Sequence, residues 1–146
     1  MESLFNTKIA KGLAPISLNS AAATAIAIDA AGYSALRVFA GFGVIGGDAT
    51  VFKLQECETT GGTYTDITGA DFTVSPLAVP ATATDAGKQF IIDVKLGGSR
   101  KRFFKLQITT GATTLVCSYA ILARADHQSL VATDLGAALT TAYAKV

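Results

Sequence analysis

The sequence predicts a single all-β domain, an antiparallel β-sandwich of jelly-roll-like or immunoglobulin-like type. About eight runs alternate apolar and polar residues, turn-forming residues separate them, and no helical segments come between them. A stretch rich in proline and small residues, 75–87, predicts a connection that crosses between two sheets. A small closed barrel is the competing architecture. We expect an N-terminal arm at 1–13, the sandwich at 14–124 and a C-terminal extension at 125–146.

The composition is that of a folded chain with few charges. Of its 146 residues, 50% are hydrophobic and 16% are charged, and the formal net charge is +1. The apolar content excludes a disordered chain, and the near-neutral charge argues against a nucleic-acid partner bound through a broad basic surface. We find no signal peptide and no run of about 18 apolar residues, and therefore expect cytoplasmic synthesis and no membrane partner.

The first 13 residues show no sustained periodicity. Phe5 and Ile9 are four residues apart, as on a short helix, and Lys8 and Lys11 lie beside them. We interpret 1–13 as an arm that becomes ordered against a partner, and a frayed tail is the alternative. In the arm interpretation, Phe5 and Ile9 enter a groove of the partner while Lys8 and Lys11 meet acidic residues at its rim.

The first half of the sandwich contains several candidate strands. Alternating apolar residues mark them at 15–19, 24–29, 35–41, 48–58 and 64–68. The last two flank a polar, glycine-containing turn, which predicts a strand, a turn and a short strand in succession.

The second half of the sandwich is organised around 100–124. Residues 89–96 form a regular candidate strand, which a glycine turn joins to that stretch. Within 100–124 two strand-like runs flank a turn at 110–112, and we predict a long hairpin in the middle of a sheet. The second run, 115–122, is apolar on both faces and is expected to be covered on both sides.

After residue 124 the alternation weakens. Leu135, Leu139 and Tyr143 are spaced four residues apart, which predicts a helical turn in the C-terminal extension. The predicted core comprises Leu36, Val38, Phe52, Leu54, Phe90, Ile92, Val94, Phe104, Leu106, Ile108, Tyr119 and Ile121.

We interpret none of the candidate motifs in the sequence as catalytic. Residues 41–46 match the dinucleotide pattern G-x-G-x-x-G, but a strand follows where the cofactor site needs a helix. We interpret these glycines as left-handed turns or close backbone contacts. His127 has no partner set for a catalytic triad and is interpreted as a surface or interface residue. Glu56 and Glu58 are interpreted as solvated charges rather than an acid–base pair. We expect no enzymatic activity.

The two cysteines, Cys57 and Cys117, both lie in strand patterns. We interpret them as buried free thiols, and a disulfide between them is the alternative. Two cysteines and a single histidine do not complete a zinc site, so we expect neither metal nor cofactor.

One basic cluster stands out, at residues 100–102. Its functional interpretation is an electrostatic contact with an acidic partner, and its structural interpretation is a solvated strand end or an edge blocked by charge. The candidate partner-interface residues are therefore Phe5, Lys8, Ile9, Lys11, Arg100, Lys101 and Arg102.

Two segments resemble small virion proteins of tailed bacteriophages. The first is Val-Phe-Lys-Leu-Gln-Glu at 51–56 with Tyr-Thr-Asp-Ile at 64–67, and the second is Arg-Phe-Phe-Lys-Leu-Gln-Ile-Thr at 102–109. The resemblance covers roughly residues 36–124 and transfers no functional residue, because these are strand patterns. It implies a β-sandwich decoration, or cement, protein that lies on the outside of the capsid and strengthens the shell.

The resemblance also implies partners and a location. We expect contacts with the major capsid protein or other virion proteins, self-association into an oligomer with a trimer as the first expectation, and a place on the capsid surface. A head–tail connector or tail structural protein is one alternative. A non-viral carbohydrate-binding or adhesive sandwich is another, in which Tyr33, Tyr64 and Tyr143 serve as the aromatic platform.

Overall fold

The computed structural model describes residues 7–23, 25–73, 86–124 and 140–145. Within these ranges the chain forms strands and no helix, so the described part contains no helix able to cross a membrane. The strands are β1 (Thr7–Lys11), β2 (Ile16–Leu18), β3 (Ile28–Asp29), β4 (Ala35–Ile45), β5 (Ala49–Cys57), β6 (Thr65–Asp71), β7 (Gln89–Lys95), β8 (Phe103–Thr110), β9 (Thr114–Ala123) and β10 (Thr140–Lys145).

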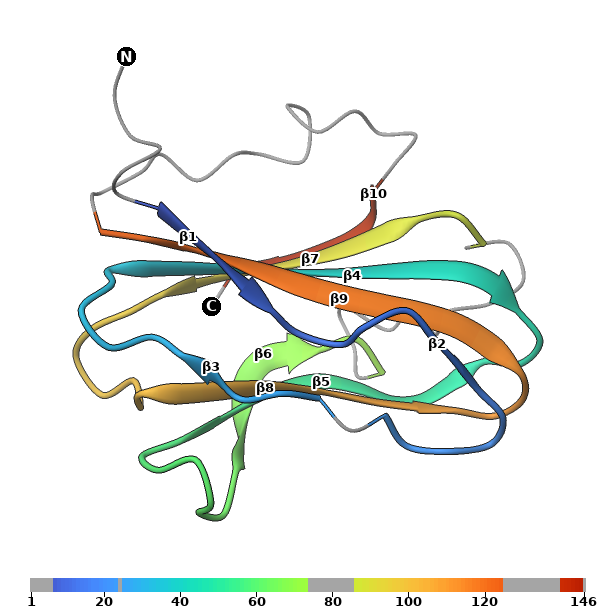
Figure 1. Cartoon of the computed structure of the whole chain (residues 1–146), viewed down its shortest axis with the longest axis horizontal. Helices are drawn as coiled ribbons and strands as arrows, with labels where there is room; N and C mark the ends of the chain where they lie inside the picture. The colour runs from blue at the N-terminus through green and yellow to red at the C-terminus, as the bar shows by residue number, and fades with distance from the viewer. Residues whose placement is uncertain (1–6, 24, 74–85, 125–139, 146) are drawn as a thin grey trace.

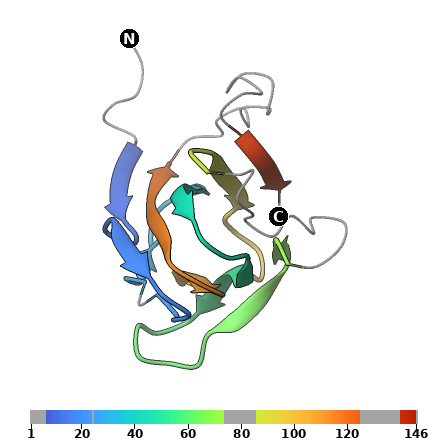
Figure 2. The same ribbon diagram turned by 90° about the vertical axis from the view of Figure 1, so that its right-hand side faces the viewer.

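The strands form two sheets that pack face to face (Figure 1). The six-stranded sheet, here sheet A, has the order β1-β9-β4-β7-β10, and β2 also pairs with β9. The four-stranded sheet, here sheet B, has the order β3-β8-β5-β6. The view turned by 90° shows the strands of both sheets around a common interior (Figure 2). The predicted all-β sandwich is confirmed.

The strand pairings are nested along the chain. β5 pairs with β6, β4 with β7, β3 with β8 and β2 with β9, all antiparallel. The antiparallel pairs β4–β9 and β5–β8 then join these partners into the two sheets. One pairing departs from the predicted antiparallel arrangement, because β10 runs parallel to β7.

The predicted hairpin over 100–124 is wrong. Its first strand, β8, belongs to sheet B and its second, β9, belongs to sheet A. The connection between them therefore crosses from one sheet to the other and packs against the β4–β5 connection. There Gly111 N–H donates to Asp48 O at 2.9 Å, and Gly46 N–H donates to Thr113 O at 2.8 Å. The glycine turn after β7 likewise leads into the opposite sheet.

Parts of both predicted terminal appendages belong to the sandwich. β1 pairs with β9 along its whole length, so residues 7–11 are a strand rather than part of a separate arm, and the helical reading of this segment is wrong. β10 pairs with β7, so Tyr143 lies in a strand rather than in a helical turn. Phe5, Leu135 and Leu139 lie outside the described residues.

A bulge separates β1 from β2. Leu13 N–H donates to Ser118 O at 3.1 Å and to Ser118 Oγ at 2.8 Å, and Ser118 N–H donates to Leu13 O at 2.9 Å. Gly12 lies so close that an added Cβ would come within 2.4 Å of Ser118 Oγ. β1 and β2 therefore act as one interrupted strand beside β9, and the interruption requires a residue without a side chain.

Phenylalanine rings fill the centre of the core. Phe52 contacts Phe42 and Phe90 edge to face, with ring centroids 5.3 and 4.9 Å apart, and stacks on Phe72 at 4.7 Å. All four rings are at most 2% exposed. Ten predicted core residues are confirmed as buried: Leu36, Val38, Phe52, Leu54, Phe90, Ile92, Val94, Phe104, Leu106 and Ile108.

The prediction that Tyr119 and Ile121 belong to the core is wrong. Tyr119 is 39% exposed and Ile121 is half-buried, because both lie on the outer face of sheet A. The opposite face of β9 enters the core through Val116, Ser118, Ala120 and Leu122. Both faces of this strand are apolar, so its periodicity did not distinguish the inner face from the outer one.

Candidate partner-binding surfaces

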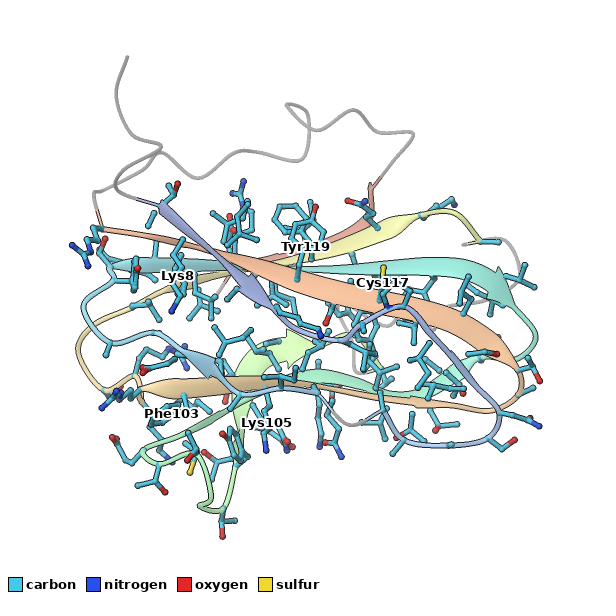
Figure 3. All side chains as sticks on the ribbon, viewed as in Figure 1. Lys8, Phe103, Lys105, Cys117 and Tyr119 are labelled. Carbon is cyan, nitrogen blue, oxygen red and sulfur yellow. The ribbon has the colours of Figure 1, made fainter. Side chains whose placement is uncertain are left out.

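The outer faces of the two sheets differ in polarity. In Figure 3, Cys117 and Tyr119 project from the outer side of sheet A, whereas Lys105 projects from the outer side of sheet B. Leu115, on the same side of β9 as these two, is 44% exposed. On sheet B the register instead pairs polar residues, Gln55 with Lys105 and Lys53 with Gln107. Sheet A therefore offers an apolar surface and sheet B a hydrophilic one.

An apolar row crosses the middle of sheet A. The register places Tyr119 beside Phe39 and Phe39 beside Ile91. The rings of Phe39 and Tyr119 stack with centroids 4.8 Å apart and planes 10° apart. Phe39 and Ile91 are buried, at 7% and 1% exposure. The stack holds the Tyr119 ring in a fixed orientation, so its exposed part is a preorganised contact surface.

A charged row lies next to this apolar row. The register places Ile121 beside Arg37 and Arg37 beside Asp93. The Arg37 guanidinium donates from Nε and Nη2 to the two carboxylate oxygens of Asp93, and the side chains are only 14% and 13% exposed. Because the pair is mutually neutralised, it adds no net charge to this face.

Strand β1 extends the apolar face to an edge of the sheet. Ile9 is 76% exposed and lies beside Ile121, and Lys11 lies beside Tyr119. Lys8 pairs with Leu122, whose side chain enters the core, so Lys8 is on the other side of β1. Of the N-terminal residues predicted to contact a partner, the structure brings Ile9 and Lys11 together with Tyr119 and separates Lys8 from them.

The basic cluster at 100–102 is bound within the molecule. Arg102 donates from Nε and Nη2 to the Asp29 carboxylate at 2.8 and 2.7 Å. These bonds, with the Ala31 N–H as a further donor, lower the pKa of Asp29 to about 2 and raise the pKa of Arg102. Lys101 Nζ donates to Thr65 Oγ1 at 3.0 Å.

Arg100, the third member of the cluster, lies 3.6 Å from Glu56. Glu56 also accepts the Lys101 N–H at 3.3 Å and is 9% exposed, so it is not the solvated charge that the sequence predicts. Glu58 is exposed in the turn after β5. The three cations thus have partners in strands of sheet B, which argues against a free electrostatic contact surface.

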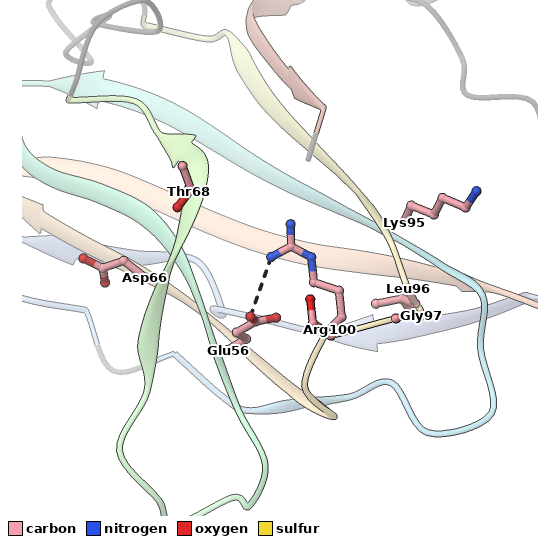
Figure 4. A pocket seen from close by; sticks show the side chains of 9 residues that line it. Glu56, Asp66, Thr68, Lys95, Leu96, Gly97 and Arg100 are labelled. Atoms are coloured by element: carbon pink, nitrogen blue, oxygen red, sulfur yellow. Dashed lines mark ion pairs between the residues drawn. The ribbon is translucent and has the colours of Figure 1, made fainter.

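A polar pocket of about 540 Å³ opens beside this ion pair (Figure 4). In Figure 4 a dashed line joins the guanidinium of Arg100 to the carboxylate of Glu56, which projects from β5. The Asp66 side chain is held by Lys53 Nζ at 2.7 Å and Gln55 Nε2 at 2.6 Å, which lower the pKa of that carboxyl. The two carboxylates that line the pocket thus already have basic or amide partners, and its described lining residues include no aromatic ring.

A second hollow, of about 260 Å³, lies on the outer side of sheet A. Gly41 and Gly43 of β4 form part of it, with Leu115 and Cys117 of β9 beside them. A Cβ on Gly43 would come within 2.8 Å of the Leu115 side chain. The glycines of the G-x-G-x-x-G pattern therefore lie in or directly after a strand, with φ angles outside the left-handed region. The close-contact interpretation of these glycines is confirmed and the left-handed-turn interpretation is wrong.

The two cysteines lie in different sheets, and Tyr33 and Tyr64 each lie near a cation. Cys57 is buried in sheet B and Cys117 is half-buried in sheet A, and both are free thiols. Lys105 Nζ lies 4.4 Å from the Tyr64 ring centroid, and Arg124 Cζ lies 5.3 Å from that of Tyr33. These two rings are therefore partly covered by cations. His127 and the Tyr143 side chain are not among the described parts of the structure.

Sequence reasoning missed the most distinctive surface residues, Tyr119, Leu115 and Cys117. The signal was present in β9, which is apolar at successive positions although only one face can enter the core. Such a strand predicts either burial on both sides or an apolar surface. Nothing in the local pattern decides between these outcomes.

The comparisons with known proteins add no relative. No protein-family model matches this chain, and no curated protein matches its sequence.

Among the described residues, no group of three or more His, Cys, Asp or Glu side chains is arranged to hold a metal ion.

Proposed function

We propose that this chain is a structural virion protein that binds the outside of a bacteriophage capsid and stabilises the shell. The observation that carries the proposal is the polarity difference between the two outer faces of the sandwich. Sheet A presents Tyr119, Leu115 and Ile9, while sheet B presents lysine and glutamine side chains. Such a body can lie with sheet A against a protein shell and leave sheet B in water.

The proposal includes a jelly-roll type for the sandwich. The nested antiparallel pairs from β5–β6 outward to β2–β9 support it, because two Greek keys across two sheets produce this kind of order. Jelly rolls occur in viral capsid and lectin domains, so the fold type is compatible with more than one function.

The proposed capsid contact is made by a surface that is already folded. Burying the exposed Ile9 side chain contributes up to about 1.5–3 kcal/mol, and burying the smaller exposed part of Tyr119 contributes less. Because β1 is paired with β9, the contact does not require the backbone of 7–11 to be ordered on binding. The partner-contacting set thus becomes Ile9, Lys11, Tyr119 and Leu115, with the major capsid protein as the proposed partner and the capsid surface as the proposed location.

Two other functions remain as competing proposals. A head–tail connector or tail structural protein would use the same apolar face on a different virion partner. A carbohydrate-binding sandwich is favoured by one observation, the part-exposed Tyr119 ring stacked on Phe39, since sugars pack on aromatic faces. Both alternatives give the outer face of sheet A a binding role and differ in what it binds.

The test is to mix the full chain with purified phage capsids that lack it and to measure binding and capsid disruption temperature. We expect saturable binding, a higher disruption temperature, and loss of both effects in Tyr119→Asp and Leu115→Asp. The control is Thr68→Asp, which introduces the same charge at an exposed position of sheet B. Thermal melts of the free variants establish that they fold.

Absence of capsid binding by the full chain would overturn the decoration proposal. Binding to isolated tails or connectors instead would favour the first alternative. Binding to immobilised glycans that depends on Tyr119 would favour the second. Equal loss of capsid binding in Thr68→Asp would show that sheet A is not the contact surface.

A further inference from the structure

Gly41 is a glycine in the interior of a central strand of sheet A. It belongs to β4, which has a neighbour on either side, and the register pairs it with Cys117 of β9 and with Gln89 of β7. Its φ angle lies outside the left-handed region, so the backbone conformation does not require glycine. Glycine weakens a strand at such a position and often marks a place where another molecule approaches the backbone closely.

The packing of the described residues leaves room for a side chain at this position. Apart from its chain neighbours, a Cβ at Gly41 would have one described atom within 4 Å, Cys117 Sγ at 3.3 Å. Gly43 differs, because a Cβ there would come within 2.8 Å of the Leu115 side chain. Within the described part of the chain, close packing therefore explains Gly43 and does not explain Gly41.

Gly41 lines the hollow of about 260 Å³ on the outer side of sheet A. Leu115 and Cys117 of β9 also line it, and Lys88 and Gln89 are the only polar residues in its described lining. A cavity of about 150 Å³ is enough to bind benzene in another protein, so this hollow has room for a whole aliphatic or aromatic side chain. The mostly apolar lining favours an apolar occupant.

The hollow is continuous with the proposed capsid contact surface. Leu115, which is 44% exposed, belongs to both. Cys117 lies between Leu115 and Tyr119 on the same side of β9, and Figure 3 shows Cys117 and Tyr119 projecting from the outer side of sheet A. The surface therefore combines a part-exposed aromatic ring with an adjacent depression, an arrangement into which a partner can insert a side chain.

The charges on this face indicate which kind of segment supplies that side chain. Among the described outward-facing residues of sheet A the only carboxylate is Asp93, and Arg37 binds both of its oxygens. Lys11 is exposed and lies beside Tyr119. The charge next to the Tyr119 ring is therefore positive, which favours a partner segment that carries a carboxylate.

We propose that the hollow at Gly41 receives one apolar side chain of the capsid partner, from a segment that also carries an acidic residue facing Lys11. Glycine is kept at position 41 because a side chain there would occupy the space of the inserted group. The hollow selects the segments that fit, while Tyr119 and Leu115 supply contact area around it. This inference rests on the proposed function and adds the chemistry of the partner segment.

The first test fills the hollow from within. Gly41→Leu should weaken binding of the full chain to purified capsids that lack it by about tenfold or more. Gly61→Leu is the matched control, because a Cβ at Gly61 meets no described atom within 4 Å and the residue lies in an exposed turn between two strands of sheet B. Thermal melts of the free variants show whether they fold.

The two free thiols provide a second test that needs no substitution. Cys117 lines the hollow and is half-buried, whereas Cys57 is buried in sheet B. Alkylation by N-ethylmaleimide, followed by mass spectrometry, should become about tenfold or more slower at Cys117 when the chain is bound to capsids, because the inserted side chain covers the thiol. Reactivity of Cys57 should change little.

The third test concerns the acidic residue of the partner segment. Lys11→Glu should weaken capsid binding about tenfold or more at low salt, and the loss should be smaller at about 1 M salt because surface charges are screened. Lys105→Glu is the matched control, since it makes the same change on the outer side of sheet B and should bind as the unchanged chain does.

Each outcome decides the inference. Weaker binding by Gly41→Leu and Lys11→Glu, normal binding by both controls and protection of Cys117 support it. If Gly41→Leu does not fold, the alkylation of the unchanged chain decides. If the full chain binds capsids while Cys117 stays reactive, or while Gly41→Leu or Lys11→Glu binds equally well, the inference is wrong and the proposed function stands. A full chain that binds no capsid overturns the proposed function and this inference with it.

Discussion

Arg37 and Asp93 form a two-pronged ion pair between β4 and β7 on the outer face of sheet A, with both side chains largely buried. Removing one member of the pair takes an opposite charge away from the other in a site of low water access. We expect Asp93→Asn to lower the free energy of unfolding by about 3 kcal/mol, as for other broken buried pairs. Urea unfolding at neutral pH measures the effect.

The double variant Arg37→Met, Asp93→Leu measures the interaction energy between the two residues. It removes both charges together, so its cost should be clearly smaller than the sum of the two single substitutions. Strict additivity would contradict the direct interaction seen between β4 and β7.

The Asp29–Arg102 contact should make stability depend on pH in the acidic range. The pKa of Asp29 is lowered from 3.8 to about 2 in the folded chain. The folded state therefore binds fewer protons than the unfolded state between these values, so the contribution is full above about pH 4 and is lost as the pH falls to about 2. Since the pair is solvent-exposed, we expect Asp29→Asn to cost only about 0.5 kcal/mol at pH 7.

Thermal melts of the two proteins at pH 7, pH 4 and pH 2 check this expectation. The difference in melting temperature should shrink as the pH falls, and it should also shrink at 1 M salt because exposed pairs are screened. A difference that grows toward acid would contradict the assignment to this carboxylate.

The core should respond strongly to a single truncation in sheet B. Leu106 is 3% exposed and lies opposite Leu54 of β5. Leu106→Ala removes buried methyl groups and leaves a cavity, so we expect a loss of about 2–5 kcal/mol in the free energy of unfolding. Ile9→Ala is the control at an exposed apolar position. Similar losses in the two variants would contradict the burial pattern.

The bulge beside β9 should tolerate no added side chain. A Cβ at Gly12 would meet Ser118 Oγ at 2.4 Å and the Ser118 carbonyl oxygen at 3.0 Å. Relief requires movement of the β9 backbone, so we expect Gly12→Ala to cost about 1–3 kcal/mol.

Gly61→Ala is the control, because a Cβ there meets no atom within 4 Å and the residue has no positive φ. It should leave the denaturation midpoint nearly unchanged. A neutral Gly12→Ala variant would mean that the bulge relaxes without cost.

The sequence predicts individual strands well because each has its own periodicity. Phe52 and Leu54 alternate with polar neighbours, as do Phe104 and Leu106, and all four are buried as expected. The periodicity of a strand does not predict which other strand it pairs with. The turn after Thr110 looks like a hairpin turn, yet it crosses between sheets, since turn-forming residues allow both routes.

The candidate surface was predicted only in part. Ile9 and Lys11, predicted to contact a partner from an arm, instead lie on an edge strand, because five residues of such a strand show too short a pattern to be recognised. The prediction places Tyr119 in the core because its strand is apolar on both faces and is expected to be covered on both sides. Arg102 and Arg100 pair with Asp29 and Glu56. Because these carboxylates are distant in sequence, the local pattern could not predict the pairs.

The nested order of strand pairs has a consequence for how the chain reaches its native state. β2 and β9 are separated by most of the chain, so their direct encounter would carry a large loop-closure entropy. The β5–β6 hairpin is local, and its formation brings β4 and β7 close together. Their pairing in turn brings β3 toward β8, and that pair brings β2 toward β9. Folding can therefore proceed as a zipper from the middle of the chain outward, with the β1 edge completed last.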